Sequence, residues 1–329
     1  MSEDGDRRLQ AARSWDAYWR LAPQAPALSV GGGQDAALSR FWAGVFARGG
    51  AGRPARSVLD FACGNGAVTG FAIEAGGDAG GGPSLFGADG APAAIEAFRT
   101  RFPGAGAIVA EARRMPFADG AFDIVASQFG IEYAGIGAIE EAARLVAPGG
   151  VLAAVLHSRD GAIFRECEHS LQAMERVRAS DILAAATEVF RRGAAAVRGR
   201  GSQAQFRRAE AKFAAAVTEV DAVLRDHGDA VAGGTVHRIY VDLAHMYGRL
   251  AAYDPAEVAL WLDRMGGEIT AYLGRMSAMV ASAVDAEGLE RAAGLAVSCG
   301  LSVRSKEALV ADARDREASA AWVLVCDRP

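Results

Sequence analysis

Apolar and polar positions along this chain follow one pattern between residues 57 and 157 and a different one in the segment that comes next. In the first region, short apolar runs rich in Val, Ile, Leu and Ala alternate with stretches that have helical spacing. This pattern predicts the order strand, helix, strand, helix, strand, helix, strand, helix, strand. Such an alternation is typical of an α/β fold, in which helices cover both faces of a parallel sheet.

Residues 161–284 show almost no strand signal. Apolar residues recur there at helical spacing, for example at Val217, Val220 and Leu224. Gly or Pro residues predict breaks near 199–201, 233–234, 254–255 and 266–267. We therefore expect four or five helices, in an inserted segment of about 120 residues that can bury a small core of its own.

The first 50 residues precede the strand and helix alternation. A helix is predicted over 7–20, with Trp15, Tyr18 and Trp19 on one side. A linker rich in Pro and Gly follows over 21–33, and a second short helix is predicted over 35–47. The aromatic stripe fits a hydrophobic core and the edge of a ligand site equally well.

Composition narrows the class of protein. The chain is 51% hydrophobic with a formal net charge of −5, which indicates an ordered globular protein without an overall basic surface for nucleic acid. A local basic run between residues 191 and 208 is more typical of a solvated helix end. The four cysteines form no C-x-x-C pair, so neither a zinc site nor a disulfide framework is expected. The acidic, polar N-terminus and the lack of a long apolar run favour a cytoplasmic protein without a membrane span.

The most informative stretch is residues 57–70, which read SVLDFACGNGAVTG. An apolar strand runs into Asp60, a turn of small residues follows, and then a helix begins. Glycine lets the chain turn sharply, and the helix start offers unpaired N–H groups to a ligand. Gly64, Gly66 and Gly70 could belong to a dinucleotide fingerprint. Against this, the carboxylate of Asp60 would repel a diphosphate and attract an ammonium group.

With Asp60, Ala62, Gly64 and Gly66, this loop resembles motif I (D-x-A-x-G-x-G) of the class I S-adenosylmethionine (SAM)-dependent methyltransferases. Further family patterns follow in order, and together they are far more specific than one glycine loop. These are a strand at 84–89 that ends in an acid, Glu111 and Ala112 after a third strand, Met-Pro-Phe at 115–117, Phe-Asp-Ile-Val at 122–125, and Pro-Gly-Gly at 148–150. The likeness favours the small-molecule (type 11) branch of the family.

The resemblance also covers the C-terminal part of the chain. It implies a last helix over 289–300 and an antiparallel pair of strands over 301–310 and 320–326. The implied fold is thus a seven-stranded, mostly parallel, doubly wound sheet with a large all-helical insertion between strand five and the last helix. The expected parts are an N-terminal helical lid (1–50), a SAM-binding core (51–158), the helical insertion as a substrate lid (159–285), and a segment that completes the core (286–329).

By the same resemblance the cofactor is SAM, with S-adenosylhomocysteine as its product. Asp60 would orient the loop and engage the methionine ammonium through it. Asp89 would bind the ribose hydroxyls and Glu111 the adenine amino group. The expected cofactor-binding residues are Asp60, Ala62, Cys63, Gly64, Asn65, Gly66, Asp89, Gly90, Glu111, Ala112, Gln128 and Phe129.

Methyl transfer from a sulfonium chiefly requires that donor and acceptor be positioned, and a general base is needed only when the acceptor must lose a proton. The candidates near the ends of strands four and five are His157, Glu132 and Tyr133. Histidine is a common general base at neutral pH, yet His157 could equally be a buried structural histidine. His237, Asp242 and His245 could share part of a helix face, but no further close ligand follows and no metal is expected.

The sequence therefore favours a SAM-dependent methyltransferase that acts on a small apolar or aromatic acceptor. Two alternatives remain: a SAM-binding regulatory or scaffold protein without catalysis, and a nicotinamide-dependent oxidoreductase. No nucleic-acid partner is expected, and the long inserted helices could pair two chains into a homodimer. The sequence does not identify the acceptor or the atom that is methylated.

Overall fold

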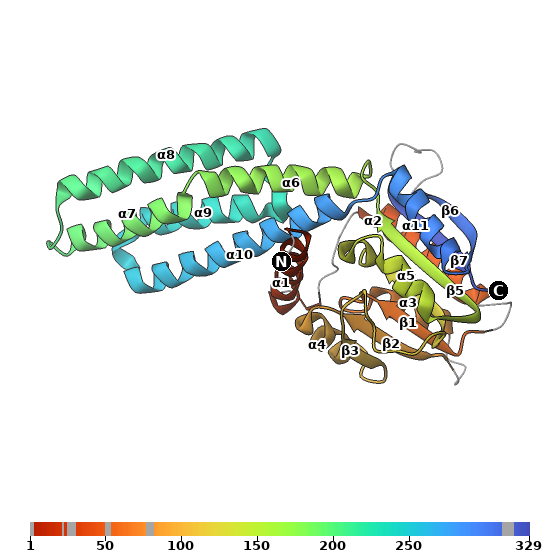
Figure 1. Ribbon diagram of the computed structural model, residues 1–329. Coiled ribbons are helices and arrows are strands. Elements are labelled where there is room, and N and C mark those ends of the chain that lie inside the picture. The colour runs from red at the N-terminus through yellow and green to blue at the C-terminus, as the bar shows by residue number, and fades with distance from the viewer. Residues whose placement is uncertain (1–2, 22, 25–30, 50–53, 77–81, 311–318) are drawn as a thin grey trace. The chain divides into compact units, whose positions relative to one another are not determined.

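The computed structural model describes residues 3–21, 23–24, 31–49, 54–76, 82–310 and 319–329 (Figure 1). The chain divides into two compact units. The core unit comprises Met1–Arg165 and Ala278–Pro329, and the helical unit comprises Glu166–Ser277. Each unit is described by itself below.

A seven-stranded sheet forms the centre of the core unit, and the predicted α/β fold with a mostly parallel sheet is confirmed. Its strands are β1 (Ser57–Phe61), β2 (Ser84–Asp89), β3 (Gly106–Val109), β4 (Phe122–Gln128), β5 (Val146–His157), β6 (Ser302–Val310) and β7 (Ser319–Asp327). The strand order is β3-β2-β1-β4-β5-β7-β6. The first five strands are parallel to one another, and β7 runs antiparallel to both β5 and β6.

The strand order changes direction at β1. Leu59 of β1 pairs with Phe86 of β2 on one side and with Val125 of β4 on the other. The chain therefore proceeds outward to β3 and then returns across the sheet to β4. Ligands of doubly wound sheets bind outside the carboxyl ends of the strands at such a reversal.

Helices cover both faces of the sheet, because successive side chains of a strand point to opposite faces. Leu59 and Leu152 pack in one cluster with α5 (Ala138–Leu145) and α11 (Ala286–Ser298). The neighbouring side chains Val58 and Val151 pack in another cluster with α2 (Gly31–Arg48) and α3 (Ala67–Gly76). The core is thus a three-layer arrangement built on alternating apolar positions.

The predicted helix between the third and fourth strands is wrong. Residues 110–121 form turns and bends instead of a helix. The connection is short, and it contains Pro116 and Gly120, both of which disfavour a helix interior. Backbone groups of Met115, Phe117 and Gly120 pair with α5 instead of forming a helix of their own.

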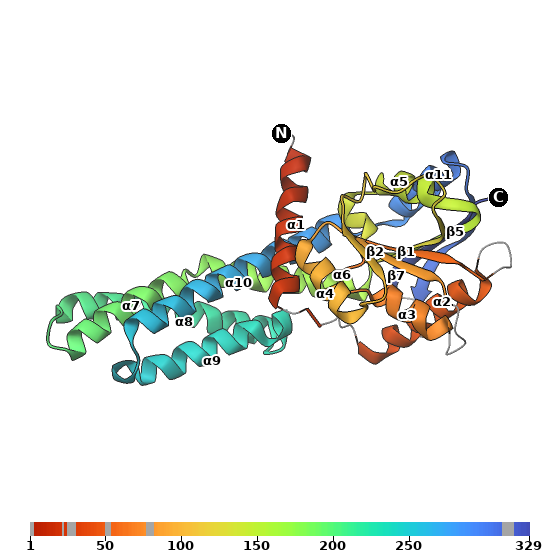
Figure 2. The ribbon, with the colours of Figure 1, turned by 90° about the horizontal axis from the view of Figure 1, so that it is seen from below.

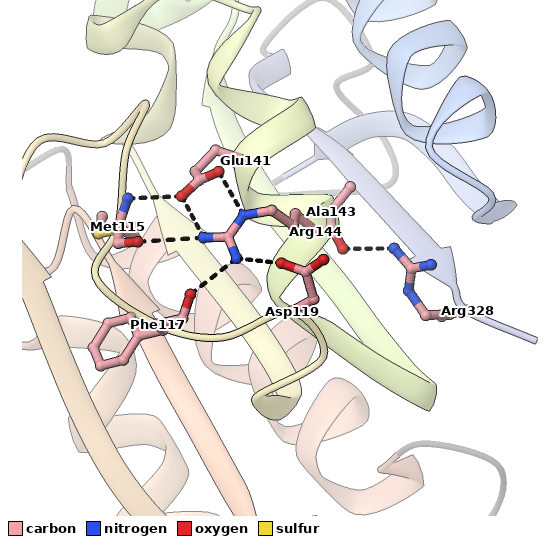
Figure 3. Close-up of polar contacts among 7 residues, drawn as sticks. All are labelled: Met115, Phe117, Asp119, Glu141, Ala143, Arg144 and Arg328. Atoms are coloured by element: carbon pink, nitrogen blue, oxygen red, sulfur yellow. Dashed lines mark hydrogen bonds and ion pairs between the residues drawn. The ribbon is translucent and has the colours of Figure 1, made fainter.

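Arg144 of α5 holds this connection (Figure 3). Its guanidinium donates to the carbonyl oxygens of Phe117 (2.9 Å) and Met115 (3.3 Å) and to the carboxylate of Asp119 (2.6 Å). Glu141 orients the guanidinium from the same helix and also accepts the Met115 N–H at 2.6 Å. These bonds give partners to polar backbone groups of the connection around Met115, its one buried residue.

Two helices precede the sheet. They are α1 (Glu3–Leu21) and α2, so the predicted helices at 7–20 and 35–47 are found with longer bounds. Trp19 of α1 is buried against Ala91 and Ala93 at the start of α4 (Pro92–Arg101), where Asp16 accepts the N–H of Ala93 at 2.9 Å. Most of the predicted linker over 21–33 lies outside the described residues, and its last three positions belong to α2.

The helices of the helical unit run alongside one another, as both ribbon views show (Figures 1 and 2). Between β5 and α11 the chain forms α6 (Ala162–Ala179), α7 (Ile182–Val197), α8 (Gln203–His227), α9 (Thr235–Gly248) and α10 (Pro255–Ser282). Their apolar faces bury a common core that includes Val189, Phe213 and Ile239. The inserted segment thus has a hydrophobic core of its own.

Three of the four predicted helix breaks coincide with the ends of these helices, but the break at 266–267 is wrong. The helix α10 continues through Gly266 and Gly267. Each glycine costs roughly 1 kcal/mol relative to alanine in a helix, and burial of Met265, Ile269 and Leu273 in the unit's core outweighs that cost. A break that the sequence pattern did not indicate occurs at Asp181, whose φ is +53°.

Within the described ranges, no helix has both the length and the apolar run that crossing a bilayer requires.

Candidate functional site

A cavity of about 1110 Å³ opens at the carboxyl ends of β1, β2 and β4. Its lining residues lie between Ala12 and Ala134 and come from the core unit. Most of the predicted cofactor-binding residues line it, namely Ala62, Cys63, Gly64, Asn65, Asp89, Gly90, Glu111, Ala112, Gln128 and Phe129. The structure therefore brings residues from several strand ends into one site.

The turn after β1 requires glycine at two positions. Gly64 and Gly66 have φ values of +53° and +85°, a region that side chains disfavour. A Cβ atom at Gly64 would lie 2.7 Å from the Trp19 ring, and one at Gly66 would lie 2.5 Å from the Phe102 ring. Both glycines let the loop pack closely against aromatic side chains. Gly64 lines the cavity, whereas Gly66 does not.

Asp60 lies behind the cavity rather than in its wall. The side chain is buried, and its Oδ2 accepts the Thr69 N–H at 2.9 Å and the Thr69 hydroxyl at 2.8 Å. These bonds tie the end of β1 to the first turn of α3. Burial raises the pKa of Asp60 to about 7, although the bonds from Thr69 act in the opposite direction.

Asp89 connects the glycine turn to the next helix. Its Oδ2 accepts the Gly64 N–H at 2.9 Å, and its Oδ1 accepts the Ala91 N–H at 2.8 Å. Burial raises the pKa of this carboxyl, and the backbone N–H bonds oppose the rise. The N–H of Gly64 is thus directed to a carboxylate of the protein and not outward to a phosphate. This arrangement disfavours a pyrophosphate and leaves carboxylate lone pairs for a hydroxyl donor.

The end of β4 forms another part of the wall. Trp42 donates its ring N–H to the side-chain oxygen of Gln128 at 2.6 Å, which fixes the amide. Phe129 has a φ of +52°, an outlier for a bulky residue, and its N–H donates to the Val155 carbonyl at 2.8 Å. Strained backbone of this kind clusters at functional sites. Glu111 and Ala112 line the cavity from the turn after β3.

The structure brings together the candidate catalytic residues but places them at different depths. Nδ1 of His157 lies 2.7 Å from Oε1 of Glu132, and the backbone N–H of His157 donates to the same oxygen at 3.0 Å. Both side chains are buried and neither lines the cavity. Tyr133 does line it, with its ring 5.7 Å from the His157 ring and 5.3 Å from the Trp15 ring, centroid to centroid.

Cys63 sits in the glycine turn with its thiol almost fully buried. Burial raises the pKa of this thiol well above its ordinary value, and the nearby carboxylates Asp60 and Asp89 add to the rise. The thiolate is therefore scarce at neutral pH, and Cys63 contributes packing rather than nucleophilic chemistry.

Several lining residues were missed in the sequence. They lie on three helices and comprise Arg20 of α1, Phe71 and Glu74 of α3, and Glu96, Thr100 and Arg101 of α4. The four-residue spacing of Glu96 and Thr100 indicates a shared helix face, but only the packing of α4 against the loop shows that this face borders a cavity. His237, Asp242 and His245 lie on α9 in the helical unit, where Nδ1 of His245 is 3.2 Å from the Tyr253 hydroxyl.

Residues 59–154 match a family model described as a methyltransferase domain. This part of the chain is thus similar to a methyltransferase domain, as its resemblance in sequence implied, and the match implies S-adenosylmethionine as the cofactor. The matched residues include the glycine turn, Asp89 and Glu111 and end within β5.

The solved structures that resemble this chain do so at low sequence identity and low TM-score. A complex between the Haloferax volcanii Trm112 methyltransferase activator and a methyltransferase is 21% identical (TM-score 0.33), over 44% of this chain and 58% of that chain. An S-adenosylmethionine-dependent methyltransferase from Mesorhizobium loti is 19% identical (TM-score 0.32), over 39% and 57%. The YcgJ protein from Bacillus subtilis is 19% identical (TM-score 0.31), over 36% and 51%.

The chain thus spans between half and three fifths of the length of these solved structures. At these TM-scores the likenesses carry no conclusion about activity or partners. No curated protein matches the sequence.

Proposed function

We propose that the protein transfers a methyl group from SAM to a small-molecule acceptor in the cavity of the core unit. The observation that carries the proposal is that the glycine turn, Asp89 and Glu111 of the methyltransferase domain all open on one cavity. SAM supplies a methyl group on a positively charged sulfonium. The carboxyl groups that line the cavity, among them Asp89 and Glu111, suit a cation better than they suit a phosphate.

Each part of the cofactor has a proposed partner in this chain. The backbone of Gly64 permits close approach, Gly66 lets the turn pack against Phe102, Asp89 accepts from the ribose hydroxyls, and Glu111 accepts from the adenine amino group. Asp60 acts indirectly, because it holds α3 through Thr69 and thereby shapes the turn. The flanking residues that complete this proposed set are Ala62, Cys63, Asn65, Gly90, Ala112, Gln128 and Phe129.

The cavity also has room for an acceptor. Its volume of about 1110 Å³ exceeds the roughly 300–1,000 Å³ that a pocket for one drug-sized ligand requires. Aromatic rings of Trp15, Trp19, Phe71, Phe129 and Tyr133 contribute to its wall. We infer an acceptor that is largely apolar or aromatic, since flat apolar surfaces favour stacking on such rings.

The N-terminal helix is part of this proposal. Trp15, Trp19 and Arg20 of α1 line the cavity, so α1 acts as a lid on the core unit. We also propose that the helical unit restricts which acceptor the protein methylates. The chain leaves the sheet at the carboxyl end of β5, the side on which ligands bind, and enters α6 five residues later.

The test is calorimetric titration of the full-length protein with SAM and with S-adenosylhomocysteine. The wild type is expected to bind both. D89A should bind about 10- to 100-fold more weakly, the effect of removing a hydrogen bond to a charged group. E287A, which removes an exposed acid from α11, is the matched control and should bind as the wild type does. A wild type that binds neither ligand contradicts the proposal.

Turnover separates catalysis from binding alone. Release of S-adenosylhomocysteine in the presence of apolar and aromatic acceptors is expected of an enzyme. A protein that binds SAM tightly but releases no product with any acceptor would instead be a SAM-binding regulatory protein.

A further inference from the structure

The buried pair of Glu132 and His157 is the feature of the core unit that cofactor binding does not use. Glu132 lies in a short 3₁₀ turn after β4 (Ile131–Ala134), and His157 is the last residue of β5. Relative exposure is 3% for Glu132 and 1% for His157. A carboxyl group and an imidazole buried to this extent are costly unless their polar atoms are paired.

The hydrogen bonds of Glu132 assign the tautomer of His157. Oε1 of Glu132 accepts the backbone N–H of His157 at 3.0 Å and lies 2.7 Å from Nδ1. A backbone N–H can only donate, so Oε1 serves as an acceptor, and an ionised carboxylate takes its second bond from a protonated Nδ1. A neutral imidazole with its proton on Nδ1 carries a lone pair on Nε2.

Nε2 of His157 and Oε2 of Glu132 have no hydrogen-bond partner among the described residues. Most buried polar side-chain atoms in proteins are paired, and a catalytic role is one of the reasons for which an atom is left unpaired. The lone pair on Nε2 is therefore left for a group that enters with the ligand.

The imidazole lies directly behind the cavity wall. Its ring centroid is 4.4 Å from that of Phe129 and 5.7 Å from that of Tyr133, and both of these rings line the cavity. His157 also stands at the carboxyl end of β5, on the edge of a doubly wound sheet at which ligands bind. Nε2 is itself buried, so an acceptor in the cavity reaches it only if one of these rings moves.

We propose that His157, oriented by Glu132, is the general base of the reaction and that the methyl acceptor is a hydroxyl group. The acceptor oxygen bonds to the methyl carbon while the carbon–sulfur bond breaks with its electron pair staying on sulfur, and Nε2 takes the hydroxyl proton. Glu132 stabilises the imidazolium that forms. The proton then passes to solvent as the product leaves. This inference rests on the proposed methyltransferase function and specifies its acceptor.

A hydroxyl acceptor fits the pair better than a neutral amine or a thiolate does. A neutral amine or a thiolate can attack a sulfonium methyl without a base, whereas a hydroxyl gains reactivity as its proton is removed. Together with the aromatic wall, the pair points to a phenol-type or other hydroxylated apolar molecule as the substrate class.

The first arm of the test is ¹⁵N NMR of the histidine rings in the full-length protein with S-adenosylhomocysteine bound. H157Q assigns the His157 signals among those of the five histidines. We expect a protonated Nδ1 and an unprotonated Nε2 at pH 7.5, with this preference lost in E132A, which removes the acceptor. A protonated Nε2 in the wild type overturns the proposal, because that nitrogen could not accept a proton.

The second arm is turnover with phenol, catechol and 1-naphthol, compared with aniline and thiophenol. Methylation of hydroxyl acceptors should fall about 10²- to 10⁴-fold in H157Q. Retained activity in H157Q, or methylation of the amine or thiol alone, overturns the proposal. The affinity of H157Q for SAM, measured by calorimetry, should stay within about twofold of that of the wild type.

S127A is the matched control that tests whether Glu132 and His157 have only a structural role. The buried Ser127 hydroxyl accepts the Ile131 N–H at 3.1 Å and so anchors the same 3₁₀ turn from β4. S127A should leave both the His157 tautomer and hydroxyl methylation unchanged. If S127A reproduces the losses of H157Q, the pair only holds the turn in place. If the wild type fails to bind S-adenosylhomocysteine, it is the proposed function that fails and not this inference alone.

Discussion

At the scale of single residues, the burial of Asp60 makes the stability of the folded protein depend on pH. Its pKa is about 7 in the folded protein, against an ordinary value of 3.8, because burial disfavours the charged form. Between these two values the folded state holds a proton that the unfolded chain has already released. Stability from this group is therefore present at low pH and is lost as the pH rises from about 4 to about 7.

Asp60→Asn tests this assignment. The amide keeps the shape of the side chain and can still accept from Thr69, but it cannot ionise. Between pH 4.5 and pH 7.5, the free energy of unfolding of the wild type should fall by about 3 kcal/mol relative to that of the variant. Urea denaturation at several pH values measures this difference. Parallel pH profiles of the two proteins would contradict the assignment.

Gly64 gives a second prediction at this scale. Gly64→Ala places a Cβ atom 2.7 Å from Trp19 at a positive φ, so either the turn or α1 must shift. We expect a loss of about 1–3 kcal/mol of stability and weaker SAM binding, measured by thermal unfolding and calorimetry. Gly44→Ala in α2, where nothing lies within 4 Å of the added atom, should leave SAM binding intact. Equal behaviour of the two variants would show that the turn tolerates a side chain.

At the scale of secondary-structure elements, α5 determines the connection between β3 and β4. Arg144→Ala removes the donors that hold the carbonyls of Met115 and Phe117, and it leaves Glu141 without its cation. A loss of about 2 kcal/mol is expected, with faster hydrogen exchange at the Met115 and Gly120 amides. Arg144→Lys keeps the charge but not the planar set of donors and should recover only part of the loss. Unchanged exchange in Arg144→Ala would mean that the loop holds its conformation by other contacts.

Local patterns in the sequence were sufficient to predict most strands of the sheet. The strands β1, β2 and β4 are apolar runs with clear ends. Asp60 and Asp89 lie at the carboxyl ends of β1 and β2, on the same edge of the sheet. The conformation of the loop over 110–121 was not predictable, because its bonds to Met115 and Phe117 come from Arg144, which is distant in sequence. The continuity of α10 across Gly266 and Gly267 likewise depends on burial in a core that the sequence pattern does not show. The depth of His157 behind the cavity wall is also a property of tertiary packing.

At the scale of the whole molecule, the cavity and the core of the helical unit involve separate sets of residues. Phe213 belongs to the core of the helical unit, whereas the cavity is lined by residues 12–134. Phe213→Ala should cost about 3–5 kcal/mol of stability yet leave SAM affinity within about twofold of the wild type. Chemical denaturation and calorimetry on the same preparation compare the two effects. A parallel loss of affinity would show that the helical unit supports the cofactor site.

The burial of Cys63 has a practical consequence that extends to the other cysteines. Burial also raises the pKa of Cys167 to about 12 and that of Cys326 to about 11, whereas Cys299 is half-buried at the end of α11. Maleimides and iodoacetamides attack thiolates, so these three sites react slowly in the folded protein. A fluorophore can therefore be attached at Cys299 of the natural sequence without removing any cysteine. Labelling at the other three then marks molecules that have unfolded.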